Sequence, residues 1–225
     1  MVSTDTHHHF FCSDMFIFDD ILLKLNKIDL KQGEYLHINE LRKRLCSVLK
    51  SNVKIDTGQD NTLDRYQHIM SGVYLEEYGK ILLIITASEK TKGVVCIEDL
   101  DRFKFCVAQI VQHEYIHHLQ HIKREELIVD DVFMCKQCTD HQRYLATYDE
   151  IDAYAYDVVL EFKRYGWGRS DVLELYKKEF SKEHPVVKRL LKKTYKKWEL
   201  LNERNRTANA RYYDKSKKYG FGNEV

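Results

Sequence analysis

Two histidines and a glutamate in one short string are the residues of this chain best suited to chemistry. His113, Glu114 and His117 form an HExxH pattern within the string HEYIHHLQH. Residues four apart lie on one face of a helix, so both imidazoles can reach the same metal ion. Glu114 directly follows the first histidine and can direct its carboxylate at a metal-activated water. The spacing is typical of zinc sites in which two histidines bind the ion and a glutamate acts as general base.

The residues around the motif have the pattern of one long helix. Between residues 101 and 122 no proline or glycine interrupts the chain, and Asp99 or Asp101 can cap its start. Apolar residues recur at helical spacing and predict a buried stripe, which consists of Phe103, Val107, Ile110, Val111 and Leu119. Upstream, the apolar runs at 80–86 and 93–97 predict buried strands. An edge strand followed by a ligand-bearing helix is the order that a zinc-peptidase cleft requires.

A third ligand is needed, because catalytic zinc usually binds three protein groups and keeps a fourth position for water. His121 lies eight residues after His113, roughly 12 Å along a helix axis, which is too far for one ion to bridge. His118 points about 100° away from His117 on the same helix. Neither histidine is therefore expected to complete the site.

The string TYDEIDAYAYD, which begins at Thr147, is the better source of a third ligand. It opens a second helix that Thr147 or Asp149 can cap, and its small alanines allow close approach to the metal-binding helix. Asp149 and Asp152 are rival donors on neighbouring faces. We favour Glu150, because its longer side chain can reach between two helices whereas Asp149 suits the cap.

The two blocks together resemble small zinc metallopeptidases of the glutamate-zincin type, which phages and bacteria encode. The matching residues are His113, Glu114, His117 and Gln120, and then Glu150, Ile151, Asp152, Ala153, Tyr154 and Ala155. The resemblance spans roughly residues 65–165 and implies a zincin-like fold with Zn2+ bound by His113, His117 and Glu150. It also implies that Glu114 is the catalytic base. The string CKQCTDH between the blocks departs from the family pattern.

Further residues near the motifs allow two interpretations each. Cys135, Cys138 and His141 could hold a second, structural zinc with one more ligand, but no second CxxC exists and reduced thiols are preferred. Gln120 is expected at the surface rather than beside a ligand. Catalysis also needs a hydrogen-bond donor for the developing oxyanion, and the nearby candidates are Tyr144, Tyr154, Tyr156, His141 and Arg143. We nominate Tyr154, four residues after Glu150, although a packed core tyrosine is the commoner outcome.

The charge of the chain is concentrated at its C-terminal end. Residues 182–225 contain 13 Lys or Arg and 5 Asp or Glu, a net charge of +8 against +1 for the whole chain. After Pro185, apolar residues recur at helical spacing, namely Val187, Leu190, Leu191, Trp198 and Leu201. The basic residues therefore line the opposite face of an amphipathic helix. That face is either simply solvated or a contact for nucleic acid or an acidic partner.

Composition predicts an α+β protein dominated by helix. With 44% apolar residues in 225, the chain can bury a core. No signal peptide or membrane span is predicted, and six cysteines without a secretion signal indicate reduced thiols in a cytoplasm, that of the host cell or a virion if a phage encodes the protein. The expected elements are helices at 15–30, 39–51 and 170–182, a loop at 52–65, and a hairpin formed by 68–75 and 80–86.

These elements predict a zincin-like minidomain with a small β-sheet, flanked by N- and C-terminal helices. The expected segments are an N-terminal helical segment, a catalytic domain and a basic helical extension, at 1–58, 59–168 and 169–225. The function expected is that of a zinc-dependent metallopeptidase acting on a protein or peptide. The alternative is a nucleic-acid or virion-associated binding protein with a structural zinc site and a basic tail, which closed coordination by four protein ligands would favour.

Overall fold

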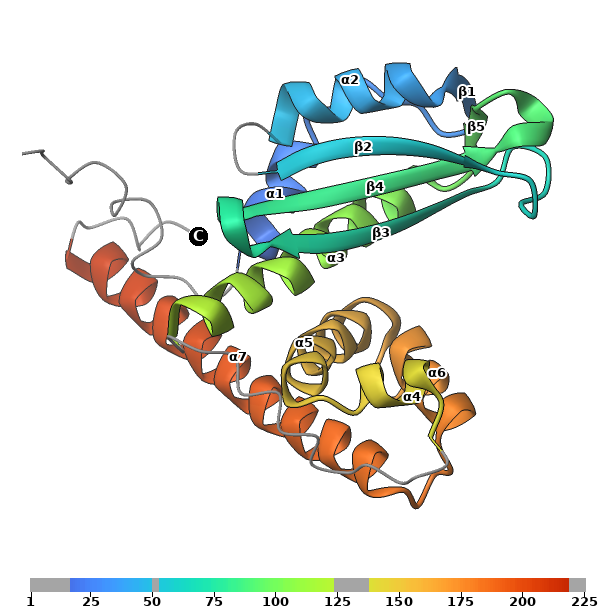
Figure 1. Ribbon diagram of the computed structural model, residues 1–225. Helices are drawn as coiled ribbons and strands as arrows, with labels where there is room; N and C mark the ends of the chain where they lie inside the picture. The colour runs from blue at the N-terminus through green and yellow to red at the C-terminus, as the bar shows by residue number, and fades with distance from the viewer. Residues whose placement is uncertain (1–16, 50–52, 124–137, 219–225) are drawn as a thin grey trace, which may run out of the picture. The chain divides into compact units, whose positions relative to one another are not determined.

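The computed structural model describes residues 17–49, 53–123 and 138–218, with side chains described up to residue 202 (Figure 1). The chain forms two compact units, residues 1–128 and 129–225. The first unit combines helices with small sheets and the second is helical, so the protein is a mixed, helix-dominated α+β molecule as expected. Among the described helices, none combines the length and the apolar character needed to cross a membrane.

The main sheet of the first unit has three strands in the order β2-β4-β3. The central strand β4 (Lys80–Ser88) is the apolar run KILLIITAS, whose alternate residues Ile81, Leu83, Ile85 and Ala87 are buried. The edge strand β3 (His68–Leu75) pairs with it antiparallel, from His68 opposite Ala87 to Leu75 opposite Lys80. A 3-10 turn, η1 (Glu76–Tyr78), and Gly79 with φ 57° connect the two strands. The predicted hairpin is confirmed.

The other edge strand, β2 (Val53–Asp60), occupies residues predicted to form a loop, so that prediction was wrong. This strand pairs parallel with β4, from Val53 opposite Ile81 to Asp60 opposite Ser88. Only Ile55 is buried, and Lys54 and Asp56 are exposed. A polar edge strand of this kind lacks the apolar pattern that identifies a strand in a sequence.

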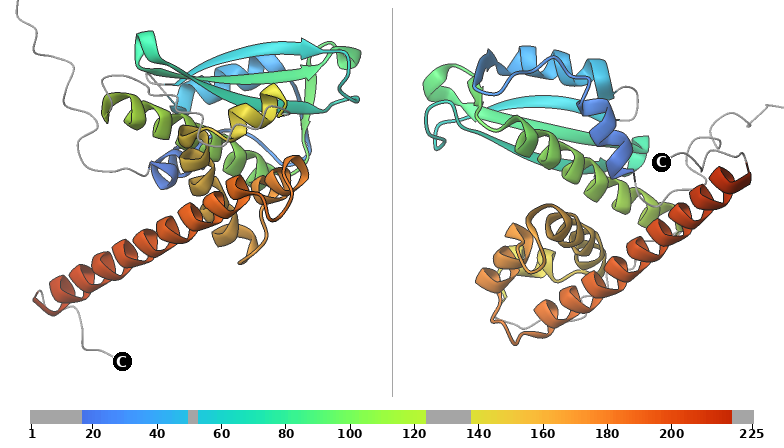
Figure 2. Two further views of the ribbon diagram at one scale, coloured as in Figure 1. Left: turned by 60° about the horizontal axis from the view of Figure 1, so that its bottom comes forward. Right: turned by 180° about the vertical axis from the view of Figure 1, so that it is seen from behind.

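The helix α3 (Leu100–Lys123) packs along β3 and the central strand of the same sheet (Figures 1 and 2). Asp99 caps its start, since the Asp99 carboxylate accepts the backbone N–H of Arg102 at 2.8 Å. Phe103, Val107 and Val111 of the predicted stripe are buried, whereas Ile110 and Leu119 are half-buried. The predicted helix and its apolar face are therefore confirmed, and this helix carries the HExxH motif.

Two further helices and a small ribbon complete the first unit. Helix α1 (Phe18–Leu25) packs on α3, and the buried Gln112 side chain of α3 accepts the N–H groups of Ile17 and Phe18 at 2.8 and 3.0 Å. Helix α2 (Ile38–Leu49) packs on β2. Strands β1 (Glu34–His37) and β5 (Val94–Ile97) form a separate antiparallel pair, and a 3-10 turn, η2 (Glu89–Thr91), precedes β5. The helix predicted at 15–30 ends earlier, at Leu25.

The second unit is built from helices α4 (Asp140–Leu145), α5 (Tyr148–Tyr165), α6 (Asp171–Glu179) and α7 (Pro185–Lys218). Its core joins apolar residues of all four helices, among them Leu145, Ile151, Val158, Phe162, Leu173, Tyr176, Val186, Val187 and Leu190. Thr147 caps α5 and Gly166 ends it, as predicted. Leu191, predicted to lie on the apolar face of α7, is 42% exposed, so that assignment was wrong. The exposed face of α7 includes Lys188, Lys192 and Lys196.

A buried carboxylate anchors the start of α6. Glu161 of α5 accepts hydrogen bonds from the Ser170 hydroxyl and from the backbone N–H of Val172. The Ser170 hydroxyl in turn accepts the N–H of Leu173 at 3.0 Å. Two N–H groups of the first turn are thereby satisfied, and the negative charge lies at the positive end of the α6 dipole.

Ser170→Ala should destabilise the second unit by about 1–2 kcal/mol, because it removes a helix cap and a hydrogen-bond donor to a buried carboxylate. The free energy of unfolding from denaturant titration measures this loss. Ser181→Ala, at an exposed turn residue of the same unit, is the matched control and should change it by less than about 0.5 kcal/mol. Equal effects of the two substitutions would show that Ser170 is not an anchor.

Candidate metal centre

His113 and His117 lie one turn apart on α3 with their rings turned toward each other. Their Nε2 atoms are 3.2 Å apart, and the rings meet edge to face with centroids 4.9 Å apart. Two nitrogens bound to one tetrahedral zinc at 2.0–2.1 Å would be about 3.3–3.4 Å apart. The spacing of the pair therefore fits a shared metal ion.

Gln120 fixes the orientation of the second histidine. Its side-chain oxygen lies 2.8 Å from Nδ1 of His117, and Gln120 is buried, 7% exposed. An amide oxygen can only accept a hydrogen bond, so the proton of His117 is held on Nδ1 and the lone pair stays on Nε2. The prediction of a surface position for Gln120 was wrong. Its place three residues after His117, on the same helix face, was the signal that could have shown this contact.

Glu114 is buried on the same helix, at 7% exposure, and its side chain lies next to Gly72 of the edge strand β3. Two residues further along this strand, the hydroxyl of Tyr74 lies 3.0 Å from Nδ1 of His118. Burial, and then the neighbouring His121, lower the pKa of His118. The sequence did not identify Tyr74 as a residue that contacts α3. Tyr74 lies two residues after Gly72, so both residues are on the same face of the strand.

Glu150 is buried in the first turn of α5, and its backbone N–H is donated to the Thr147 hydroxyl at 3.4 Å. The rival Asp152 instead binds two lysines of α7, Lys193 at 2.9 Å and Lys197 at 3.1 Å. Burial opposes ionisation of Asp152, but these two ammonium groups outweigh it and hold its pKa below the ordinary value. The ion pairs of Asp152 thus hold α5 against α7.

His113, His117 and Glu150 form a group that could hold a metal ion. Each offers one ligand atom, and these atoms all lie within 4.8 Å of one another. Two imidazoles and one carboxylate suit zinc and related divalent transition metals. The candidate ligands chosen from the sequence are the residues of this group.

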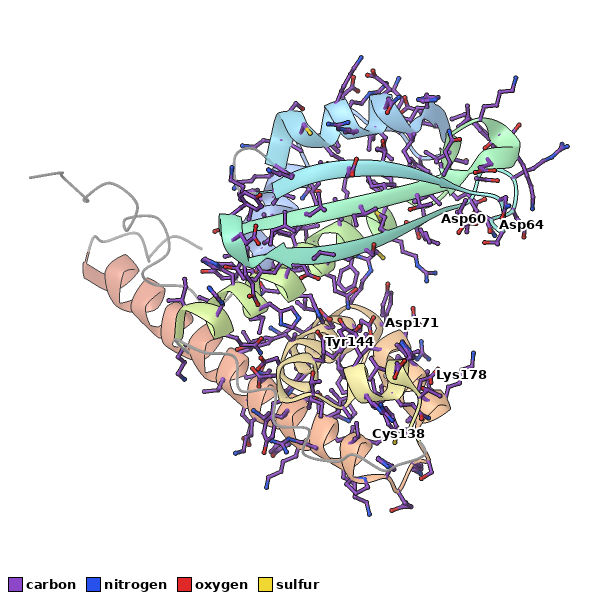
Figure 3. All side chains as sticks on the ribbon, in the orientation of Figure 1. Asp60, Asp64, Cys138, Tyr144, Asp171 and Lys178 are labelled. Carbon is purple, nitrogen blue, oxygen red and sulfur yellow. The ribbon has the colours of Figure 1, made fainter. Side chains whose placement is uncertain are left out.

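The candidate oxyanion donors have different surroundings. Tyr154 is half-buried and meets the ring of Tyr176 edge to face, with centroids 5.6 Å apart. Tyr156 is buried, with the Lys197 ammonium 3.7 Å from its ring centroid. The others lie on α4, where Tyr144 is 49% exposed and His141 and Arg143 are exposed. Tyr144 is labelled in Figure 3. Tyr154 packs against the core of the second unit, and its role as an oxyanion donor stays a prediction.

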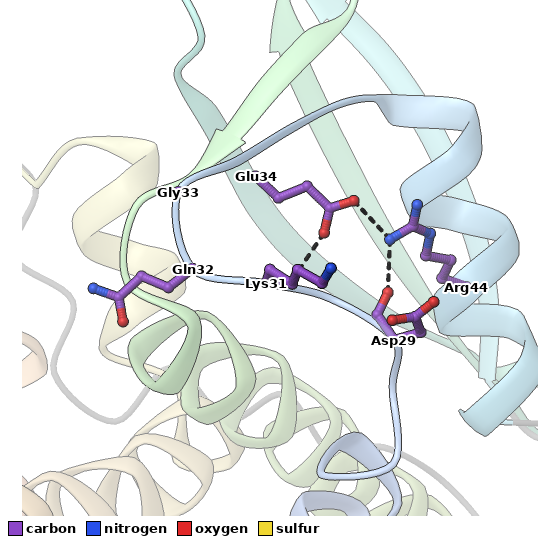
Figure 4. Close-up of a pocket in the computed structure, with 6 residues that line it drawn as sticks. All are labelled: Asp29, Lys31, Gln32, Gly33, Glu34 and Arg44. Carbon is purple, nitrogen blue, oxygen red and sulfur yellow. Dashed lines mark hydrogen bonds and ion pairs between the residues drawn. The ribbon is translucent and has the colours of Figure 1, made fainter.

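Two other features do not contribute to this centre. Reduced thiols were preferred to a second zinc site at Cys135, Cys138 and His141, and this choice depends on Cys135, which lies outside the described residues. Figure 4 shows a polar pocket of the first unit, lined by Asp29, Lys31, Gln32, Gly33, Glu34 and Arg44. The Arg44 guanidinium there is already paired with Glu34 at 2.8 Å and Glu40 at 3.2 Å. Lys31 supplies a second cation to the lining of this pocket.

Comparisons with protein-family models, with curated proteins and with solved structures find no match to this chain.

Gln120→Leu should weaken zinc binding by about 10–100-fold, because the oxygen that orients His117 is lost. The dissociation constant from competition with a chromogenic chelator measures this effect. Gln120→Glu keeps an acceptor at the same reach and should bind zinc about as well as the unchanged protein. If the leucine variant binds zinc equally well, Gln120 does not orient the ligand.

Proposed function

We propose that this protein is a zinc-dependent metallopeptidase with a zincin-like catalytic region. The observation that carries the proposal is the geometry of α3. Its two imidazole Nε2 atoms converge to 3.2 Å, and the carboxylate between them in sequence is buried against an edge strand. A metal-binding pair, a base and a strand edge are the parts that hydrolysis of a peptide requires.

The residues present fit a catalytic rather than a closed metal site. His113, His117 and Glu150 would hold the ion, and the group contains three ligands among the described residues. Three protein ligands leave a position open, whereas structural zinc is bound by four. When bound there, a zinc ion would polarise the scissile carbonyl and activate a water molecule for attack.

Glu114 would carry the protons of the reaction. Its carboxylate accepts a proton from the attacking water as the water oxygen bonds to the carbonyl carbon, and passes it to the leaving amine as the carbon–nitrogen bond breaks. Tyr154 is the nominated donor to the oxyanion that forms between these steps. Burial of Glu114 keeps bulk water away from the transferred proton.

The edge strand β3 supports a peptide as the substrate class. Among the described residues β3 pairs with β4 alone, so the backbone groups of its other edge can bind an extended chain. Strand addition selects for an extended backbone rather than for one side chain. We therefore propose unfolded or loop segments of proteins as substrates.

The alternative proposal keeps a structural zinc and assigns function to the basic face of α7. Lys188, Lys192 and Lys196 are exposed on that helix and could contact nucleic acid or an acidic protein. Lys188 is already paired with Glu183 at 3.0 Å. The peptidase is preferred because a structural zinc needs a fourth protein ligand, and the group found among the described residues has three.

Glu114→Gln should lower peptide hydrolysis by about 10²–10⁴-fold, because the amide cannot accept the proton of the attacking water. Cleavage of unfolded casein and of a quenched fluorescent peptide mixture measures the rate. Zinc content, measured by mass spectrometry, should not change. Glu77→Gln, an exposed residue of the same unit, is the control. Retained hydrolysis in the Glu114 variant would contradict the assigned role.

Glu150→Ala should sharply reduce bound zinc, because the ion would lose its only anionic ligand among the three. Metal content after dialysis against a weak chelator measures the loss. Asp152→Asn tests the rival carboxylate and should keep zinc while lowering the stability of the second unit, since it weakens the contacts with Lys193 and Lys197. If the Asp152 variant alone lost zinc, the third ligand would be reassigned.

A further inference from the structure

The edge strand β3 has a glycine at the point where it meets Glu114. Gly72 pairs with Leu83 of β4 and lies on the face of the strand that α3 covers. A Cβ atom built at Gly72 would lie 2.6 Å from Cγ and 2.7 Å from Oε1 of Glu114, and 2.7 Å from Cγ2 of Ile110. Carbon atoms in favourable contact are about 3.5–4.0 Å apart. The space of the missing side chain is thus filled by Glu114 and Ile110.

Backbone conformation does not explain this glycine. Gly72 is not among the described glycines with positive φ, so a residue with a side chain could adopt its backbone geometry. Glycine inside a strand weakens it, because the backbone entropy is high and no side chain packs. Close approach of a neighbouring group is the remaining reason for its presence.

We propose that Gly72 is a positioning residue for Glu114. The absence of a Cβ lets the carboxylate lie directly against the β3 backbone, at the edge where an extended substrate would be added. Any larger residue at 72 would push the carboxylate away from that edge and displace the proton acceptor from the scissile bond. The kinetic consequence rests on the proposed peptidase function, whereas the steric fit does not.

Gly58 provides a matched control. It lies in β2, the opposite edge strand of the same sheet, and it also lacks a positive φ. A Cβ there would meet the Thr86 hydroxyl at 3.4 Å and its methyl group at 3.8 Å, which are ordinary contacts. Gly58→Ala therefore measures how alanine in an edge strand changes stability and activity when it causes no steric clash.

The first experiment uses stability and needs no activity. The melting temperature is measured for Gly72→Ala in an Ile110→Ala background, which removes the steric clash with Ile110. The Gly72→Ala substitution is made once with Glu114 present and once together with Glu114→Ala. The melting temperature should fall by several degrees only when Glu114 is present. An equal fall in both backgrounds would show that Glu114 does not occupy the space, and the proposal would be overturned.

The second experiment uses kinetics in the same Ile110→Ala background. Gly72→Ala should lower kcat on the order of 100-fold, because an ångström-scale displacement of a catalytic group costs about that much. KM and zinc affinity should change little, and Gly58→Ala should keep the activity of the background. Unchanged kcat in the Gly72 variant would overturn the positioning role. If the unchanged protein cleaves no peptide, the proposed function fails, and the stability experiment still decides the steric fit.

Discussion

The close approach of two imidazole nitrogens is the constraint on which the candidate site depends. His117 donates its Nδ1 proton to Gln120, so its Nε2 atom presents a lone pair to Nε2 of His113 at 3.2 Å. Two lone pairs at that distance would repel, and the contact is favourable only if a proton or a cation lies between the nitrogens. A divalent ion satisfies both nitrogens at once. The buried amide of Gln120 thus directs the Nε2 lone pair of His117 at His113, where it can accept the Nε2–H of a neutral His113 or share a metal ion with it.

The geometry of β3 and α3 explains how the base reaches a strand edge. Residues on one face of the strand contact successive turns of the helix. His68 contacts Phe103, Gly72 lies against Ile110 and Glu114, and Tyr74 contacts His118. Six residues of strand rise about 20 Å and fifteen residues of helix about 22 Å, so the two elements advance together. A strand of matching length and direction therefore aligns its glycine with the HExxH turn. A shift of β3 by one residue would turn Gly72 to the other face.

The sequence predicted those elements whose signals lie within a few neighbouring residues, and it failed for those that depend on contacts between distant segments. The α3 and α5 helices were predicted because periodicity, caps and the Gly166 stop all lie within a few residues of one another. The strand β2 was missed because its pairing with β4 is parallel and long-range, and its own residues are mostly polar. The prediction that Gln120 lies at the surface was wrong because the polarity of its side chain was given more weight than its position on the helix face. The role of Gly72 was not foreseeable, since it depends on which helix side chain meets the strand.

The carboxylates of α5 show how packing decides which of them can serve a metal. Asp152 is bound by Lys193 and Lys197, and burial lowers the pKa of Lys197 although Asp152 opposes that shift. Glu161 is held by the first turn of α6. Both acids therefore balance charges and dipoles inside the second unit, and moving either to a metal would leave a buried cation or helix end unmatched. Glu150, one turn from the cap of α5, is the carboxylate of this helix that joins His113 and His117 in the group that could hold a metal ion.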